Sequence, residues 1–217
     1  MVSGLAEGRE LGLAGGAALI VWGISERATR DLDYFATSSE TIDVLAPVVA
    51  QELRATGLDV QEIRSSPGFV RYQITDGSDT TELDLAWDYR MRALHQTEFG
   101  PVLDRDELAA DKVLALYGRA EARDFVDVFR LRTYYTRDQL SALALEKDRG
   151  FIAPAFAESL ARMERRDRIE FEVDDATYEN LLDEFARWRA ALTRPPLDAD
   201  RHMTAPRHEP PGSGRDL

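Results

Sequence analysis

The chain has 217 residues, enough for one domain with a substantial core or for two small subdomains that pack together. Its 40 acidic and 27 basic residues give a net charge of −13. This negative net charge argues against a protein that binds long nucleic acid through its phosphates, because such proteins usually carry an excess of basic residues. A local basic patch is still compatible with it, since arginines gather at 119–137 and 162–168.

The chain has no cysteine and only three histidines, two of which, His202 and His208, lie in a segment with few apolar residues. Disulfides and thiolate metal sites are therefore excluded, and a histidine-rich zinc site is not expected. No apolar run reaches the roughly 18 residues that a membrane helix needs. The apolar stretch at 13–22 lacks the basic region of a signal peptide. We expect a soluble, cytoplasmic protein without a membrane partner.

The first half of the chain alternates between strand and helix patterns. Apolar spacing at Leu45, Val49 and Leu53 predicts a helix over 42–56. Pro47 suggests that the regular part of this helix begins close to that residue. Strands are expected at 9–14, 29–35, 58–64, 69–75 and 81–87, with a short buried helix at 17–22 and a hairpin turn at Asp76-Gly77.

The second half is helical. The predicted helices cover 106–117, 120–134, 136–147 and 151–165, and a last one starts at Asp174 or Asp175. We expect an α+β protein with a mixed sheet and flanking helices at 1–104 and a helical lobe at 105–193. The two parts would pack together with a cleft between them. Residues 194–217 are rich in Pro, Gly, Arg and Asp, so a disordered tail is expected there.

Asp31 and Asp33 are the first candidates for chemistry. Residues i and i+2 of a strand point the same way, so the two carboxylates would project side by side. Carboxylates together with substrate phosphates suit magnesium, which keeps several waters. The alternative is two acids on the solvated face of a strand. Asp84 lies on the polar face of another strand, and three carboxylates would converge if the two strands are neighbours; the alternative is again a solvated face.

Gly15 and Gly16 lie where a strand passes into a helix. Without Cβ atoms, the backbone amides of such a turn can approach an anion. The alternative is a tight turn that needs glycine for steric reasons alone.

The helical half supplies five more charged candidates: Lys112, Arg119, Arg123, Asp124 and Asp127. Arg123 and Asp127 are four residues apart and could pair on one helix face. The alternative is a set of surface ion pairs, which contribute little. The functional interpretation places Lys112 on a triphosphate, with Asp127 orienting the lysine or the acceptor group.

Together these segments resemble the AbiEii/AbiGii-type toxin nucleotidyltransferases, the toxins of type IV toxin–antitoxin pairs within the DNA polymerase β-like superfamily. The first motif is similar to residues 13–19, although Ala17 replaces the common Thr or Ser. The second is similar to Arg27-x-Thr29-x-Asp31-Leu32-Asp33. Later motifs are similar to Leu83-Asp84-Leu85, to Lys112 with Arg119, to Arg123-Asp124-x-x-Asp127 and to Phe185-x-x-Trp188.

The resemblance implies a two-lobed fold and a metal-dependent transfer of NMP from an NTP to an acceptor hydroxyl. Mg2+ or Mn2+ would be held by Asp31, Asp33 and Asp84. The nucleotide would contact Gly15, Gly16, Thr29 and Lys112, and Asp127 would assist Lys112 or orient the acceptor.

The resemblance also implies a tRNA 3′ end as the acceptor and an antitoxin protein as a partner. Two alternatives remain: a small-molecule or protein acceptor, and a non-catalytic binding partner with the same fold.

Overall fold

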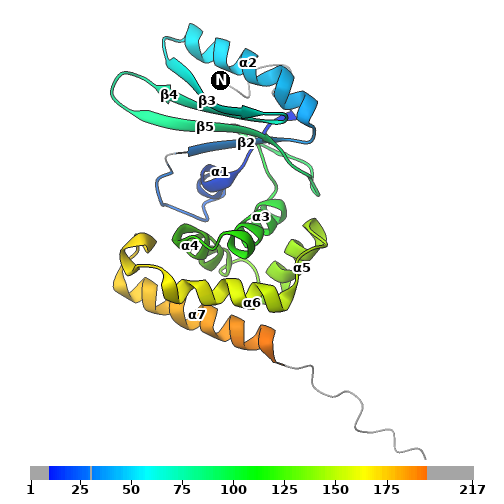
Figure 1. The fold of residues 1–217 in the computed structure, drawn as a ribbon, viewed down its shortest axis with the longest axis vertical. Coiled ribbons are helices and arrows are strands. Elements are labelled where there is room, and N and C mark those ends of the chain that lie inside the picture. The colour runs from blue at the N-terminus through cyan, green and yellow to red at the C-terminus, as the bar shows by residue number, and fades with distance from the viewer. Residues whose placement is uncertain (1–9, 30, 195–217) are drawn as a thin grey trace, which may run out of the picture.

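The computed structural model describes residues 10–29 and 31–194. These residues form a seven-stranded mixed sheet and a helical half, with helix α1 (Gly15–Val21) between them (Figure 1). The predicted α+β class is therefore confirmed. The strand order is β3-β4-β5-β2-β1-β7-β6, and the strands are β1 (Gly12–Leu13), β2 (Asp31–Ala36), β3 (Asp59–Ser66), β4 (Phe69–Thr75), β5 (Thr80–Trp87), β6 (His95–Thr97) and β7 (Gly100–Val102).

The centre of the sheet is the pair β2–β5, whose strands run parallel. Strands β3, β4 and β5 follow one another in antiparallel pairs, and the β4–β5 hairpin agrees with the turn signal at Asp76-Gly77. Strand β1 is much shorter than the predicted strand at 9–14. Strands β6 and β7 are absent from the prediction, because three-residue strands carry too few alternating positions to stand out.

Helix α2 (Ser39–Ala55) covers one face of the sheet (Figure 1). The buried side chains of β4 and β5 that meet it alternate along each strand: Val70 and Tyr72, then Leu83 and Leu85. The expectation that regular helix begins near Pro47 is wrong, since Pro47 lies inside α2. Pro47 and Asp43 are both exposed. Water can therefore bind the Asp43 carbonyl that lacks a helical donor.

The helical half contains α3 (Arg105–Gly118), α4 (Ala122–Leu131), α5 (Arg137–Lys147), α6 (Ala153–Ala161) and α7 (Asp175–Thr193). The predicted helix over 120–134 is shorter at both ends. Ala120 has a φ of 50°, and a capping box between Glu121 and Asp124 starts α4. Thr136 and Asp174 are the N-caps of α5 and α7, which agrees with the predicted starts of these two helices. None of the described helices is both long and apolar enough to cross a membrane.

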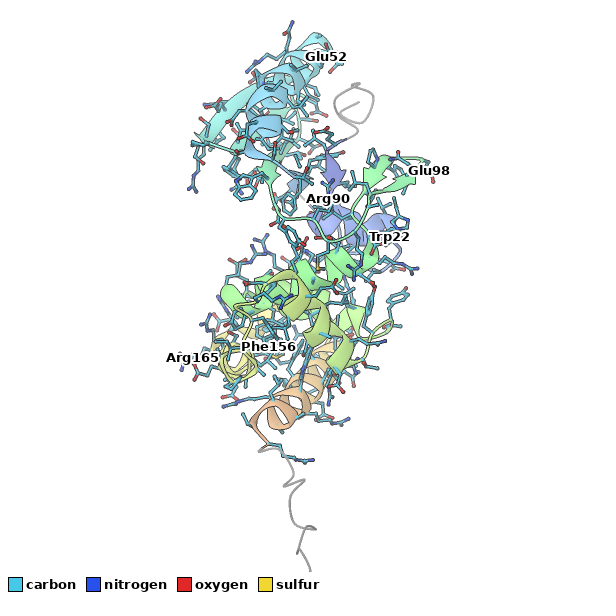
Figure 2. All side chains as sticks on the ribbon, turned by 90° about the vertical axis from the view of Figure 1, so that its right-hand side faces the viewer. Trp22, Glu52, Arg90, Glu98, Phe156 and Arg165 are labelled. Atoms are coloured by element: carbon cyan, nitrogen blue, oxygen red, sulfur yellow. The ribbon has the colours of Figure 1, made fainter. Side chains whose placement is uncertain are left out.

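Two hydrophobic cores result. One lies between α2 and the sheet. The other fills the helical half around Phe125, Phe156 and Trp188, and it also includes Ala17, Ala18 and Leu19 of α1. Helix α1 thus belongs to the helical core although it precedes the sheet in sequence. Trp22, just after α1, donates to the Leu103 carbonyl at 2.9 Å and lies at the level between the two halves (Figure 2). Residues 195–217 of the predicted tail lie outside the part of the chain that the structure describes.

Candidate active site

A cavity of about 540 Å³ lies between the sheet and the helical half. Its floor is the face of β2 and β5 opposite α2, and its roof is formed by α3 and α4. We call it the active-site cavity. The residues to which the family resemblance gives a role in catalysis, nucleotide binding or metal binding all line it: Gly15, Gly16, Thr29, Asp31, Asp33, Asp84, Lys112 and Asp127.

Strand register determines the floor. Asp31 and Asp33 share one face of β2, and the parallel pairing places Asp33 directly opposite Asp84 of β5. The three acids named from the sequence are thus neighbours on one surface. Burial raises the pKa of Asp33, the nearby Lys112 lowers it, and the carboxylates of Asp84 and Asp31 raise it again. The net shift is upward, so the floor disfavours its own negative charge.

The glycine turn lies directly against this floor. Gly15 has a φ of 61°, and a Cβ there would lie 1.7 Å from Asp33 Oδ2. A Cβ on Gly16 would lie 3.1 Å from Thr29 Oγ1. Thr29 in turn donates to the Asp31 carbonyl at 3.1 Å. The turn therefore needs glycine both for its backbone conformation and because an acid of the floor occupies the adjacent space.

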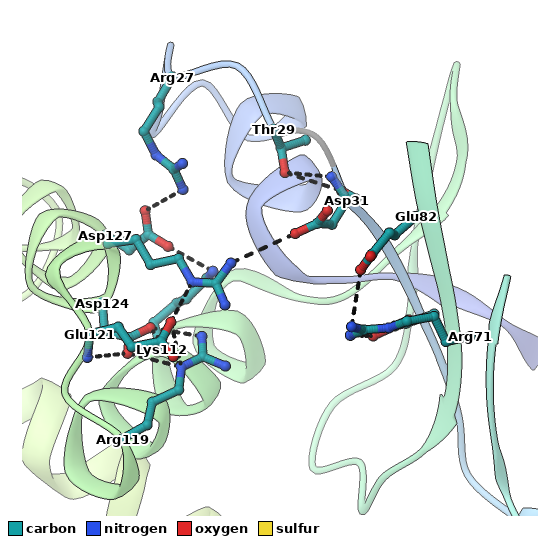
Figure 3. A network of polar contacts seen from close by, with 12 residues as sticks. Arg27, Thr29, Asp31, Arg71, Glu82, Lys112, Arg119, Glu121, Asp124 and Asp127 are labelled. Carbon is teal, nitrogen blue, oxygen red and sulfur yellow. Dashed lines mark hydrogen bonds and ion pairs between the residues drawn. The ribbon is translucent and has the colours of Figure 1, made fainter. Parts of the chain in front are cut away.

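Asp84 has a partner that the sequence analysis did not identify. Two guanidinium nitrogens of Arg71 on β4 donate to the Asp84 carboxylate, Nε to Oδ1 and NH2 to Oδ2, each at 2.7 Å. The same guanidinium reaches Glu82 at 3.0 Å (Figure 3). The Asp84 carboxylate raises the pKa of Arg71 further above its usual range. The predicted turn did not signal this contact: a two-residue turn at Asp76-Gly77 would place Arg71 opposite Glu82, whereas the strands pair Thr75 with Thr80 and Arg71 with Asp84.

The roof contributes Lys112, whose Nζ donates to Asp127 Oδ2 at 2.8 Å. The two side chains are 10% and 2% exposed, so the pair is buried. Arg27 approaches the other oxygen, with 3.9 Å between its NH2 and Asp127 Oδ1. The idea that Lys112 and Asp127 act together is thus matched by a direct contact, and Arg27 joins them from the loop after α1.

The other roof charges pair differently from the expectation. Arg123 does not bind Asp127; it contacts Glu121 at 3.0 Å and reaches Asp31 of the floor at 3.7 Å. Asp124 is fully buried and accepts from Arg119 and from the Glu121 amide. Asp124 therefore starts helix α4, while Arg123 is left on the cavity side.

Among the described residues, three buried side-chain atoms have no hydrogen-bond partner: Arg27 Nε, Asp111 Oδ2 and Asp127 Oδ1. All three residues line the active-site cavity. Buried polar atoms without partners are rare in folded proteins. Their concentration around one cavity indicates that the site is built for a polar ligand or for ordered water.

A second ionic cluster closes the other end of the cavity. Lys147, 5% exposed, binds Glu107 at 2.7 Å, Asp88 at 2.8 Å and also Asp111. Burial raises the pKa of Asp111 to about 7, although Lys147 opposes the shift. Glu107 further accepts from the amides of Met91 and Arg92. This cluster, which the sequence analysis missed, ties the loop after β5 to α3 and α5.

The floor has the oxygen donors that a divalent cation prefers. Asp31 and Asp33 share one face, and a cation would offset the burial and like-charge repulsion that raise the pKa of Asp33. Asp84 is occupied by Arg71 in this arrangement. Within residues 10–29 and 31–194, no three His, Cys, Asp or Glu side chains form a metal-binding group. The oxygen donors of Asp31 and Asp33 are nevertheless of the kind that suits a divalent cation.

Two solved structures share this fold. JHP933 from Helicobacter pylori is 17% identical with a TM-score of 0.54, and the match covers 84% of this chain and 83% of that one. A second H. pylori protein, described as a candidate nucleotidyltransferase, is 18% identical with a TM-score of 0.54, covering 84% and 86%. No curated protein sequence matches the chain significantly.

The sequence matches one family over residues 5–201, nearly its whole length. That family is described as nucleotidyl transferase AbiEii toxin, type IV toxin–antitoxin system. The fold of the two H. pylori structures agrees with this match. The chain therefore belongs to the AbiEii family of toxin nucleotidyltransferases.

Proposed function

We propose that this nucleotidyltransferase moves an NMP group from an NTP to the 3′-terminal hydroxyl of a tRNA, with magnesium or manganese held by Asp31 and Asp33. The observation that carries the proposal is the active-site cavity, where both aspartates, the glycine turn and the Lys112–Asp127 pair face one space. Family membership supports the transfer and the role of an antitoxin as partner. We infer a cytoplasmic location from the nature of these substrates.

The nucleotide is assigned to the end of the cavity near Arg27, Lys112 and Arg123. Lys112 and Arg27 donate to the triphosphate oxygens, and Asp127 keeps the lysine aimed at them through its 2.8 Å contact. The amides of Gly15 and Gly16 approach a phosphate without Cβ atoms in the way. When bound, the metal ion supplies positive charge to the phosphates of the reacting NTP.

Asp84 is assigned to the acceptor. It accepts the proton of the acceptor hydroxyl as that oxygen forms a bond to the α-phosphorus. The bond from the α-phosphorus to the bridging oxygen breaks, and pyrophosphate leaves. The protein's contribution is to position the reactants and to place opposite charge beside the phosphates before the reaction starts.

An RNA acceptor is favoured by the aromatic side chains beyond Asp84. Phe35 and Tyr89 line the cavity at the carboxyl ends of β2 and β5, and Tyr89 is 62% exposed. Exposed aromatic rings stack unpaired bases, typically contributing about 1–3 kcal/mol per base. A small-molecule or protein acceptor has no general need for such a surface. Tyr89→Ala should therefore weaken transfer to RNA more than it weakens NTP binding.

The test is to incubate the protein with each labelled NTP and total cellular RNA, and to look for a labelled RNA. Asp31→Asn should abolish labelling while the protein stays folded. Asp59→Asn, an exposed acid on β3 outside the cavity, is the matched control and should label normally. Labelling that is unaffected by Asp31→Asn would refute the mechanism. Labelling of a small molecule or protein instead of RNA would refute the acceptor.

The toxin role is tested separately in cells. Expression should arrest growth, and the product of a neighbouring gene should relieve the arrest. The Asp31→Asn variant should not arrest growth. Arrest by this variant would mean that toxicity does not depend on nucleotidyl transfer.

A further inference from the structure

The contact between Arg71 and Asp84 conflicts with the role assigned to Asp84. Each carboxylate oxygen can accept two hydrogen bonds, and Arg71 takes one position on each Asp84 oxygen at 2.7 Å while its charge stabilises the anion that an accepted proton would neutralise. Such two-pronged pairs are among the stronger hydrogen-bonded contacts in proteins. The Asp84 side chain is 14% exposed, so little of it is left open to the cavity. Displacement of Arg71 would therefore open Asp84 to an acceptor hydroxyl and remove the charge that opposes its protonation.

The order of the strands shows from which side displacement can come. Arg71 lies on β4, Asp84 on β5 and Asp33 on β2, in consecutive sheet positions. Asp84 thus separates Arg71 from the metal-binding aspartates (Figure 3 shows Arg71 on the strand side, away from the roof). The cations assigned to the triphosphate, Arg27 and Lys112, contact Asp127 of the roof. Arg71 therefore lies on the far side of Asp84 from the triphosphate, and we place the acceptor on that side.

An arginine fork fits a phosphate as well as it fits a carboxylate. The Arg71 side chain is 39% exposed and lines the active-site cavity, so a ligand can reach it. Glu82 holds NH1 at 3.0 Å, which provides a second anchor when the contact to Asp84 is lost. The Arg71 guanidinium therefore binds two carboxylates, and a ligand phosphate can reach its exposed side and compete with Asp84 for it.

We propose that Arg71 covers Asp84 until a phosphate of the acceptor RNA draws the guanidinium away, so that binding of the correct acceptor frees the carboxylate. This inference rests on the proposed function. It makes Arg71 a specificity-determining residue: an acceptor with a phosphate next to its terminal nucleoside uncovers Asp84, whereas water or a free nucleoside does not.

The first experiment compares Arg71→Gln with Arg64→Gln. Arg64 lies opposite Arg71 in the β3–β4 register but does not line the cavity, so it is a matched control. For Arg71→Gln we expect a rise in KM for the RNA acceptor of about tenfold, equivalent to about 1.4 kcal/mol, and no such rise for adenosine as acceptor. Arg71→Lys should recover part of the loss. A lower kcat with unchanged RNA KM would overturn the proposal, since a merely structural role predicts that result.

The second experiment measures pyrophosphate release without acceptor. Here water attacks the α-phosphorus, Asp84 takes the proton, and NMP and pyrophosphate are the products. Arg71→Gln should release pyrophosphate several-fold faster than the wild type, because Asp84 is no longer covered. Arg64→Gln should match the wild type. Unchanged or slower release from Arg71→Gln would contradict the covering role.

Equilibrium binding of an RNA oligonucleotide without NTP separates this inference from the proposed function. Arg71→Gln should bind about tenfold more weakly than Arg64→Gln, and equal binding would overturn the contact with an acceptor phosphate. Absence of transfer to RNA from every NTP would refute the proposed function. A clear difference in RNA binding would still support the contact in that case.

Discussion

The floor and the roof of the active-site cavity carry similar residues but use them differently. On the floor, Asp31, Asp33 and Asp84 are neighbours on one sheet face, and burial together with like charge raises the pKa of Asp33. On the roof, the buried acids are each bound to a cation, Asp127 to Lys112 and Asp124 to Arg119. Apart from Asp84, which Arg71 binds, the floor thus holds negative charge available for a ligand, whereas Asp124 and Asp127 of the roof are neutralised by neighbouring cations. We expect roof mutations to affect folding and floor mutations to affect chemistry.

The largest effect on stability should come from the roof. Asp127→Ala leaves the buried Lys112 without its partner, which should cost about 3–5 kcal/mol in the free energy of unfolding. Asp183→Ala removes an exposed partner of Arg187 and should cost about 0.5 kcal/mol or less. Urea unfolding measures both. The double variant Lys112→Met/Asp127→Leu should regain stability but not activity. A loss below about 1 kcal/mol for Asp127→Ala would erase the difference between roof and floor.

The floor should show the opposite behaviour. Asp33→Asn keeps the shape of the side chain but removes the charge, and we expect turnover to fall by about 100- to 1,000-fold. Its stability should be unchanged or slightly higher, since burial already disfavours the charged form. Asp59→Asn is again the control. Substantial unfolding of Asp33→Asn would mean that the floor, too, is held together by its charges.

The sequence predicted the floor better than the roof for a physical reason. Alternation with a period of two residues places Asp31 and Asp33 on one face of β2 whatever the neighbouring strands are. The neighbouring position of Asp84 was stated as a condition, and the parallel β2–β5 pairing satisfies it. Arg71 was missed because a two-residue turn at Asp76-Gly77 predicts another register from the observed one, in which Thr75 pairs with Thr80.

The ion pairs of the roof join residues from different helices, and no local sequence pattern predicts such contacts. Helical spacing suggested a contact between Arg123 and Asp127, which the structure does not have. The pairing of Asp127 with Lys112, fifteen residues earlier on another helix, was expected from the functional interpretation and not from spacing. The cluster around Lys147 joins three separate segments for the same reason. The α+β class and the long helices follow from periodicity, whereas the partners of buried charges depend on how the helices pack.

The glycine turn offers a sharper test of the link between backbone and floor. Gly15→Ala and Gly23→Ala both place alanine at a φ above 60°, so both should lose about 1–2 kcal/mol of stability. Only Gly15→Ala also forces a Cβ against Asp33, since nothing lies within 4 Å of a Cβ at Gly23. Displacement of the carboxylate should lower turnover by up to about 100-fold. Equal activity of the two variants would show that Asp33 tolerates displacement.

The smallest expected effect lies far from the cavity. Glu184 of α7 binds Arg132 at 2.6 Å and Arg137 at 2.7 Å, and these contacts lower its pKa to about 2. The carboxylate therefore adds stability that is fully present above its ordinary pKa of 4.5 and is lost as the pH falls toward 2. The difference in Tm between the wild type and Glu184→Gln should shrink between pH 7 and pH 3. A constant difference would mean that packing, not charge, stabilises α7 here.

Helix α1 has a consequence for how the protein can be divided. Its first residue touches a floor acid, while Ala17, Ala18 and Leu19 belong to the core of the helical half. A fragment cut after residue 104 would keep the floor but expose the apolar side of α1. A fragment that begins at residue 105 would lose the part of its core that α1 provides. The catalytic sheet is thus not a transferable module, and separately expressed halves should regain activity only when they are refolded together.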